Sequence, residues 1–323
     1  MYQKKTQNSE NIRQIIKSNN PLRLVHALQT TPELLNIIAR HGLRPIQQAI
    51  VENKVILVEI LLDHGADTSV LKPDGSSLLH LAILNSTVDL VRLLLKAGCN
   101  PCIADERGET PLFLAVHLDD LKIAKDLILH GASALVRDTN SCNVFHLAAL
   151  GDTGQELAIL LCEAVESPED LEDALCSTSK SKYSIEPISS PIETAILTKA
   201  HVALKVFLSF LSMEAINRRF NCLIDHCLKS KTSLDVVESL VAAGYHIRRE
   251  LATLDLQAYD GSAATVVPIV EYLHAMRSFV PSLFDLTRLQ ILSDVPPKER
   301  RSQEVFSQMQ LPQLLSYKLC IKF

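Results

Sequence analysis

Apolar side chains recur at helical spacing along most of the chain and return in phase every 33 residues. A small alanine keeps one register through four periods, at Ala49, Ala82, Ala115 and Ala148. Aliphatic pairs keep a second register, at Leu61-Leu62, Leu94-Leu95, Leu127-Ile128 and Leu160-Leu161. A fixed period of this length predicts a stack of similar helical units, each of which buries its apolar faces against its neighbours.

Glycines mark the same period in two series. Gly42, Gly75 and Gly108 form the first series, and a second glycine follows each of them by 23 residues, at Gly65, Gly98 and Gly131. Glycine adopts positive φ without a Cβ clash, so it is favoured in tight turns and at the ends of helices. Each period is therefore predicted to hold a helix, a tight turn and a second helix.

The clearest unit reads RGETPLFLAVHLDDLKIAKDLILHGAS. Thr110 is expected to cap the first helix with its hydroxyl, and Pro111 suits the first helical position. The second helix places Ile123, Leu127 and Ile128 on one stripe and is expected to end at Gly131.

The units become less regular toward both ends of the chain. A fourth unit runs from Ser141 to about residue 164, the polar stretch 165–187 is interpreted as an insertion, and the register resumes at Ile188 and again at Asn221. We therefore predict degenerate N-terminal capping helices over residues 1–41, repeats over 42–250, a helical connector over 251–280 and a separate C-terminal segment over 281–323.

Composition and charge exclude several classes of function. The 323 residues are 47% hydrophobic, carry a formal net charge of -5 and contain no long run of Lys or Arg. Binding to nucleic acid or to a membrane is therefore not expected. The polar start MYQKKTQNSE does not resemble a secretory signal. We expect a soluble protein of the cytoplasm, with the nucleus also open, in which the eight cysteines are reduced.

Residues with chemical potential have structural interpretations. Cys99 and Cys102 have the spacing of half a zinc site, but no second half follows. His80 and His146 share a repeat position with Phe113, which favours a hydrogen-bonding role over a catalytic one. A further group is interpreted as part of a repeat helix, namely Cys222, Asp225, His226 and Cys227. No phosphate-binding loop occurs, so we predict no catalytic residue, metal or cofactor, and an enzyme with a cysteine nucleophile is kept only as a minor alternative.

The segments GETPLFLA, GSSLLHLA and LLDHGADTS resemble the ankyrin repeat. The resemblance implies an all-α ankyrin-repeat solenoid of six to seven helix-turn-helix units, degenerate at the ends, whose concave face binds a protein substrate. The expected contacts are charged residues at the turns between units: Lys72, Asp74, Asp105, Arg107, Arg137 and Asp138.

The C-terminal segment follows a different pattern. On SLFDLTRLQI one helical face collects Leu283, Leu286, Thr287 and Ile291, and QLPQLLSY follows downstream. These two stretches resemble the elongin-binding and cullin-binding parts of a suppressor-of-cytokine-signalling (SOCS) box. Thr287 stands where that family usually has Cys, and the second proline of the cullin part is missing near Leu314.

The chain as a whole resembles the ankyrin-repeat and SOCS-box family, the substrate receptors of elongin- and cullin-containing ubiquitin ligases. That resemblance implies a helical SOCS box over residues 281–323 and a non-catalytic receptor subunit. Leu283, Leu286, Thr287 and Ile291 would bind elongin B/C, and the implied cullin-binding residues are Leu311, Pro312, Leu314 and Tyr317. The alternative is a non-ligase ankyrin scaffold or inhibitor whose last helices cap the solenoid.

Overall fold

The computed structural model describes residues 2–38, 42–150, 154–178, 189–220, 222–245 and 266–278. These residues form helices and connecting turns, and no strand occurs among them. The chain divides into two compact units, Met1–Thr139 and Asn140–Phe323, which are taken in turn. In the described ranges, no helix combines the length and the hydropathy needed to cross a membrane.

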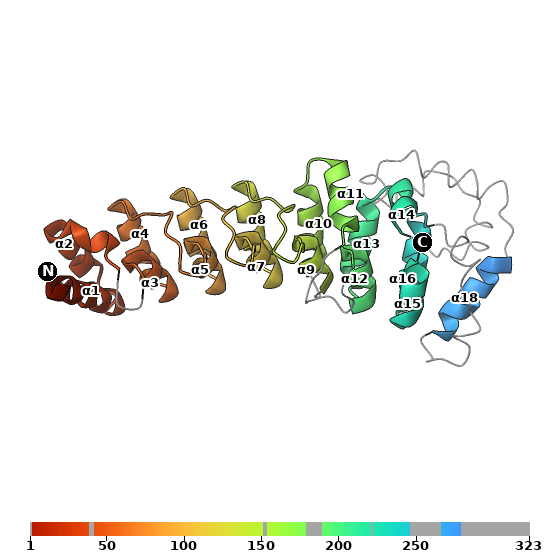
Figure 1. Ribbon diagram of the computed structural model, residues 1–323, viewed down its shortest axis with the longest axis horizontal. Helices are drawn as coiled ribbons and strands as arrows, with labels where there is room; N and C mark the ends of the chain where they lie inside the picture. The colour runs from red at the N-terminus through yellow and green to blue at the C-terminus, as the bar shows by residue number, and fades with distance from the viewer. Residues whose placement is uncertain are drawn as a thin grey trace. The chain divides into compact units, whose positions relative to one another are not determined.

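The first unit is a two-layer stack of helix pairs. Its elements are α1 (Tyr2–Lys17), α2 (Pro21–Thr30), the 3-10 helix η1 (Pro32–Asn36), α3 (Pro45–Val51), α4 (Val55–Asp63), α5 (Leu78–Leu84), α6 (Val88–Lys96), α7 (Pro111–His117) and α8 (Leu121–Leu129). The first helices α1, α3, α5 and α7 pack in series, and the second helices α2, α4, α6 and α8 form the other layer (Figure 1). Each pair therefore buries its apolar faces against the pairs beside it.

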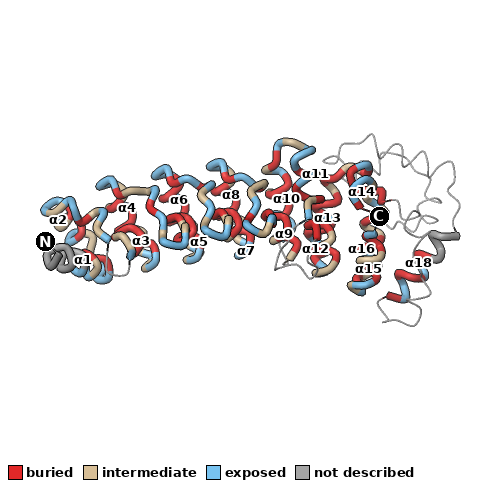
Figure 2. The backbone as a smooth tube through the Cα atoms, in the orientation of Figure 1, coloured by how far each residue is buried: buried red, intermediate tan, exposed pale blue. Residues whose placement is uncertain are grey.

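The predicted register forms the core of this unit, as the buried strip along each helix in Figure 2 shows. Ala49, Ala82 and Ala115 are fully buried, because a small side chain at this position lets neighbouring first helices approach closely. In the second helix of the clearest unit, Ile123 and Leu127 are fully buried whereas Ile128 is half-buried, so the predicted stripe is narrower than expected.

The helix ends confirm one predicted cap and overturn another. Gly131 ends α8 at φ 91, in the left-handed region. The predicted Thr110 cap is wrong: the hydroxyl is buried without a hydrogen-bond partner among the described residues. In the equivalent place on α5, the hydroxyl of Ser77 lies 2.8 Å from Nδ1 of His80. On α7 that position is occupied by Phe113, whose side chain has no polar atom and whose amide donates to the carbonyl of Thr110 at 2.9 Å.

The second unit repeats the two-layer plan with added helices. Its elements are α9 (Val144–Leu150), α10 (Gln155–Glu163), α11 (Pro168–Cys176), α12 (Pro191–Thr198), α13 (His201–Phe210), α14 (Met213–Arg219), α15 (Leu223–Lys229), α16 (Leu234–Ala242) and α18 (Val267–Ser278). Helices α9, α12 and α15 pack in series, and so do α10, α13 and α16. Phe145 and Phe207 join the two layers edge to face, with ring centroids 5.9 Å apart.

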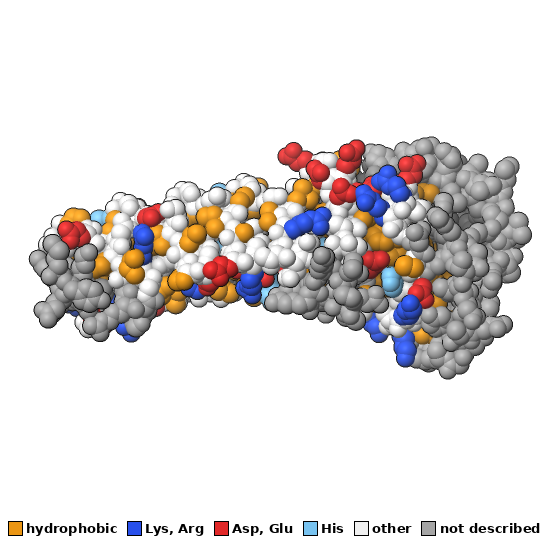
Figure 3. Space-filling model, in the orientation of Figure 1, with side chains coloured by type: hydrophobic (Ala, Val, Ile, Leu, Met, Phe, Trp, Pro, Cys, Tyr) orange, Lys and Arg blue, Asp and Glu red, His pale blue; other side chains and the backbone are white. Residues whose placement is uncertain are grey.

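Helices α11 and α14 are the additions. Helix α11 lies within the predicted insertion and packs on α12 through a buried face that includes Leu171 and Leu175. Its acidic side chains pair with the arginines of α14: Arg218 contacts Glu172, and Arg219 contacts Glu172 and Asp173. These acidic and basic groups lie side by side on the surface in Figure 3. The insertion is thus partly a packed helix.

Candidate protein-binding surface

Two turns of the first unit, residues 72–76 and 105–109, are built in the same way; we call them the tips. In the first, the amide of Lys72 donates to the carbonyl of Ser76 at 2.9 Å, and the amide of Gly75 donates to the carbonyl of Lys72 at 3.0 Å. In the second, Asp105 and Gly108 donate the corresponding bonds at 2.9 Å each. The glycines adopt φ 76 and 77, which explains the period of the first glycine series.

Neighbouring turns are also joined to each other. The amide of Glu106 donates to the carbonyl of Asp74 at 3.1 Å, and the amide of Thr139 donates to the carbonyl of Arg107 at 2.9 Å. The close approach leaves no room for a side chain, since a Cβ on Gly108 would lie 2.9 Å from the Cα of Asp138. The tips therefore form one continuous backbone row that holds its side chains in fixed places.

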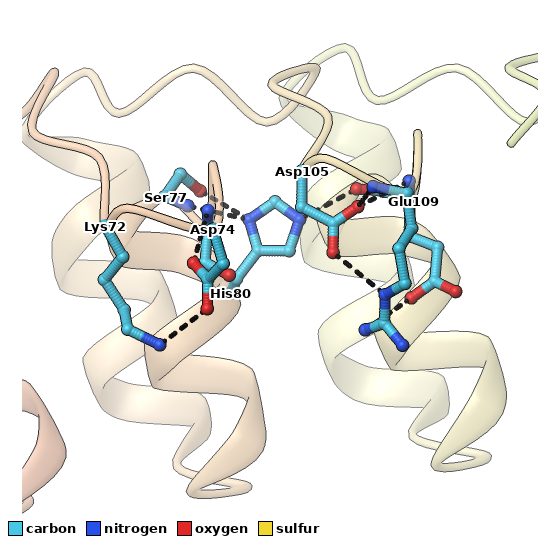
Figure 4. A network of polar contacts seen from close by, with 8 residues as sticks. Lys72, Asp74, Ser77, His80, Asp105 and Glu109 are labelled. Atoms are coloured by element: carbon cyan, nitrogen blue, oxygen red, sulfur yellow. Dashed lines mark hydrogen bonds and ion pairs between the residues drawn. The ribbon is translucent and has the colours of Figure 1, made fainter. Parts of the chain in front are cut away.

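Side-chain ion pairs lie along this row (Figure 4). The ammonium of Lys72 lies 2.8 Å from the carboxylate of Asp74, and the guanidinium of Arg107 lies 3.5 Å from Asp105 and 3.0 Å from Glu109. The pKa of Asp74 lies well below its usual value, first because Lys72 donates to its carboxylate and then because Ser76 does. In all three ion pairs the basic side chain remains in contact with solvent, so each pair is worth little to stability. Their charges are available to a partner.

The six predicted contact residues differ in exposure. Arg107 has 59% of its side chain exposed and Asp74 has 52%, and Arg137 is also exposed. Asp105 has only 8% exposed, because one of its oxygens accepts the amides of Arg107 and Glu109, each at 2.9 Å. Asp138 is likewise only 8% exposed. Asp105 therefore shapes a tip, whereas Lys72, Asp74, Arg107 and Arg137 face outward.

His80 supports the row from beneath. Its Nδ1 accepts the amide of Ser77 at 3.1 Å, so Nε2 carries the proton and donates to the carbonyl of Glu109 in the next unit at 3.0 Å. Burial lowers the pKa of His80, which keeps the ring neutral as this geometry requires. The amide of Asn143 similarly donates to Nδ1 of His146 at 3.2 Å. The predicted hydrogen-bonding role of both histidines is confirmed, and the bond to Glu109 adds a link between units.

Exposed aliphatic residues on the first helices escaped the sequence prediction. Val51 and Leu84 end α3 and α5 at the same repeat position, and both are exposed, Leu84 to 61%. The signal that could have found them is an aliphatic residue at the last helical position, outside the alanine and leucine registers. Exposed apolar side chains of this kind are suited to contact with a protein partner.

The structure separates some members of the two cysteine groups and brings others together. Burial raises the pKa of the Cys99 thiol to about 12, while Cys102 is exposed and donates to the carbonyl of Gly131 at 3.2 Å. Cys227 is fully buried in the core, and Asp225 forms an ion pair with Lys229 at 2.6 Å. Cys222 and His226 do come together, with the sulfur and one ring nitrogen within 4.8 Å of each other.

The predicted elongin-binding and cullin-binding residues lie outside the described residues, so their roles stay predictions. They are Leu283, Leu286, Thr287, Ile291, Leu311, Pro312, Leu314 and Tyr317.

Comparison with known proteins identifies the repeats. A family model described as ankyrin repeats (3 copies) matches residues 12–105 and 46–138. A search of curated proteins found no match. The stacked helix pairs of the first unit are therefore ankyrin repeats, a module through which proteins bind other proteins.

Proposed function

We propose that this chain is the substrate-recognition subunit of an elongin B/C and cullin ubiquitin ligase. In this function the ankyrin repeats hold a protein substrate, and the C-terminal segment docks on the elongin adaptor and the cullin. The subunit performs no chemistry itself. It raises the effective concentration of activated ubiquitin near the lysines of the substrate.

The observation that supports the receptor role is the row of tips. Its backbone is fixed by hydrogen bonds between repeats, so Lys72 and Arg107 present their charges from defined places. Little conformational entropy is then lost when a partner binds. The adaptor role is supported by the sequence motifs SLFDLTRLQI and QLPQLLSY alone. The scaffold or inhibitor alternative shares the first role and lacks the second.

An adaptor pull-down tests the ligase part of the proposal. Purified full-length chain is incubated with elongin B/C, alongside the variants Leu283→Asp and Leu289→Asp. Leu283 lies on the proposed anchor face and Leu289 lies to one side of it. Burial of a leucine is worth about 1.5 to 3 kcal/mol, and a buried aspartate adds a further cost, so Leu283→Asp should abolish binding and Leu289→Asp should retain it.

Failure of the folded wild-type chain to bind elongin B/C would refute the ligase part and leave the scaffold alternative. Equal loss in both variants would show that the segment does not bind through the proposed face. Far-ultraviolet circular dichroism and thermal unfolding of each variant establish that the repeats remain folded.

The substrate face is tested separately with two matched arginines. Arg107 and Arg92 both form ion pairs and have similarly exposed side chains, but Arg107 lies on a tip and Arg92 lies on α6. We expect Arg107→Glu to reduce capture of bound proteins from cell extract, and Arg92→Glu to leave it unchanged. Loss in neither variant, or equal loss in both, would place the binding surface elsewhere.

A further inference from the structure

Three side chains with metal-binding donors converge in the second unit: Glu193, Cys222 and His226. One oxygen, one sulfur and one imidazole nitrogen lie within 4.8 Å of one another. Glu193 is the third residue of α12, Cys222 directly precedes α15, and His226 follows on α15 one turn later. Helices α12 and α15 pack against each other, so the cluster joins two successive repeats of the second unit.

The carboxylate of Glu193 is held in place by the cap of its own helix. Its Oε2 accepts the amide of Ser190 at 2.8 Å and the hydroxyl of Ser190 at 2.9 Å. These bonds use one oxygen and fix the direction of the second, Oε1. A carboxylate oriented in this way is a preorganised ligand, because little side-chain freedom is lost when an ion binds.

His226 supplies an independent indication of a ligand. Its Nδ1 is buried and has no hydrogen-bond partner among the residues that the structure describes. Buried polar atoms are nearly always paired, and an unpaired one needs an explanation. Coordination of an ion by this nitrogen would provide the missing partner, since a neutral imidazole binds metals through its lone pair.

The donor types select the kind of ion. Carboxylate oxygen, thiolate sulfur and imidazole nitrogen together suit zinc, whereas calcium and magnesium take oxygen ligands. Donors that share a tetrahedral zinc lie roughly 3.5 Å apart, as the usual bond lengths require, so small rotamer changes would close the present spacing. Asp225, next to the cluster, is already paired with Lys229 at 2.6 Å.

We propose that Glu193, Cys222 and His226 form a zinc site that ties α12 to α15. Three protein ligands leave one coordination position, and Cys222 is exposed, so a water molecule completes the site from the solvent side. The ion binds the thiolate, and the thiol proton is released to solvent. This inference does not depend on the proposed ligase function, because it concerns the stability of the repeat stack.

The test uses the full-length chain freed of metal with a chelator. Zinc binding is measured by competition with a chromophoric chelator for the wild type, Cys222→Ser, His226→Gln and the control Cys102→Ser. We expect one zinc per wild-type chain, retained in Cys102→Ser and weakened at least about tenfold in the two site variants. Circular dichroism in the presence of chelator must show that all four proteins fold alike.

A second measurement needs no variant. Cys102 and Cys222 are both exposed, so each should react with iodoacetamide in the metal-free chain. Zinc is expected to slow alkylation of Cys222 and leave that of Cys102 unchanged, as followed by peptide mass spectrometry. Absence of stoichiometric binding, undiminished binding in both site variants, or no protection of Cys222 would each overturn the proposal.

Discussion

Replacement of Gly108 by alanine tests whether contact between neighbouring tips stabilises the first unit. Gly108 adopts φ 77, and its new Cβ would lie 2.9 Å from the Cα of Asp138 and 3.0 Å from the amide nitrogen of Thr139. Both atoms belong to the backbone, which cannot rotate away. Gly98 is the matched control: it adopts φ 81, and a Cβ there would meet nothing within 4 Å.

The two substitutions share one cost and differ in another. The left-handed conformation costs an alanine about 1 to 2 kcal/mol, which is partly offset by the smaller entropy of the unfolded chain. Gly98→Ala should therefore lower the free energy of unfolding by about 1 kcal/mol. Gly108→Ala must also displace the next turn, which strains the backbone there. The displacement breaks the hydrogen bond from Thr139 to Arg107, and this loss lowers the free energy of unfolding by about 1 kcal/mol more.

Urea unfolding of the full-length variants, followed by circular dichroism, measures this difference. We expect Gly108→Ala to be less stable than Gly98→Ala by about 1 to 2 kcal/mol, with an unchanged dependence on urea. In Gly108→Ala, amide hydrogen exchange should show the loss of protection at residues 105–109 and not at the end of α6. Equal midpoints for the two variants would refute the claim that contact between the tips matters energetically.

Four other predictions follow from the described contacts. His80→Ala should cost about 2 to 3 kcal/mol of unfolding free energy, since it leaves buried partners unpaired, whereas His64→Ala, at an exposed residue, should cost under about 0.5 kcal/mol by urea unfolding. Because the folded pKa of His80 is lowered, its contribution is complete above the unfolded pKa of about 6.5 and declines as pH falls below that value; His80→Phe should remove this component from a stability-pH curve. Ala115→Leu should destabilise by about 1 to 3 kcal/mol through overpacking, measured by thermal unfolding, with the exposed Ala104 changed to leucine as a control. Cys99 and Cys176, whose pKa values burial raises to about 12, should resist alkylation in the native chain, and rapid modification of either would contradict their burial.

The repeat register could be predicted from the sequence because it rests on local rules. Close helix contacts require a small residue, and turns with positive φ favour glycine, so both recur once in every period whatever the other residues are. The buried alanines, the φ of Gly131 and the histidine hydrogen bonds could therefore be predicted. The failed Thr110 cap could not, because threonine is favoured at this position whether or not its hydroxyl finds a partner. Helix α11 was missed because its acidic face concealed a narrow buried stripe.

The sequence singled out Cys222 and His226, but a change of register hid Glu193 as their neighbour. First helices α12 and α15 begin at Pro191 and Leu223, 32 residues apart, whereas second helices α13 and α16 begin at His201 and Leu234, 33 apart. Cys227 therefore takes the position that Ala195 holds in the preceding unit, and each accepts the same turn bond, from Thr232 and Ala200 respectively. A constant period would instead place Leu228 there and would misalign the residues around it.

The third residue of the first helices explains how a new site can arise within a repeat. At this position Gln47, His80, His146 and Glu193 each accept the backbone amide three residues earlier, at 2.9, 3.1, 3.2 and 2.8 Å. The structural task needs only one acceptor atom, so amide, imidazole and carboxylate can replace one another. The carboxylate alone also brings a second oxygen and a negative charge. Where that residue is Glu193 and the next unit supplies Cys222 and His226, an interchangeable structural position acquires ligand chemistry.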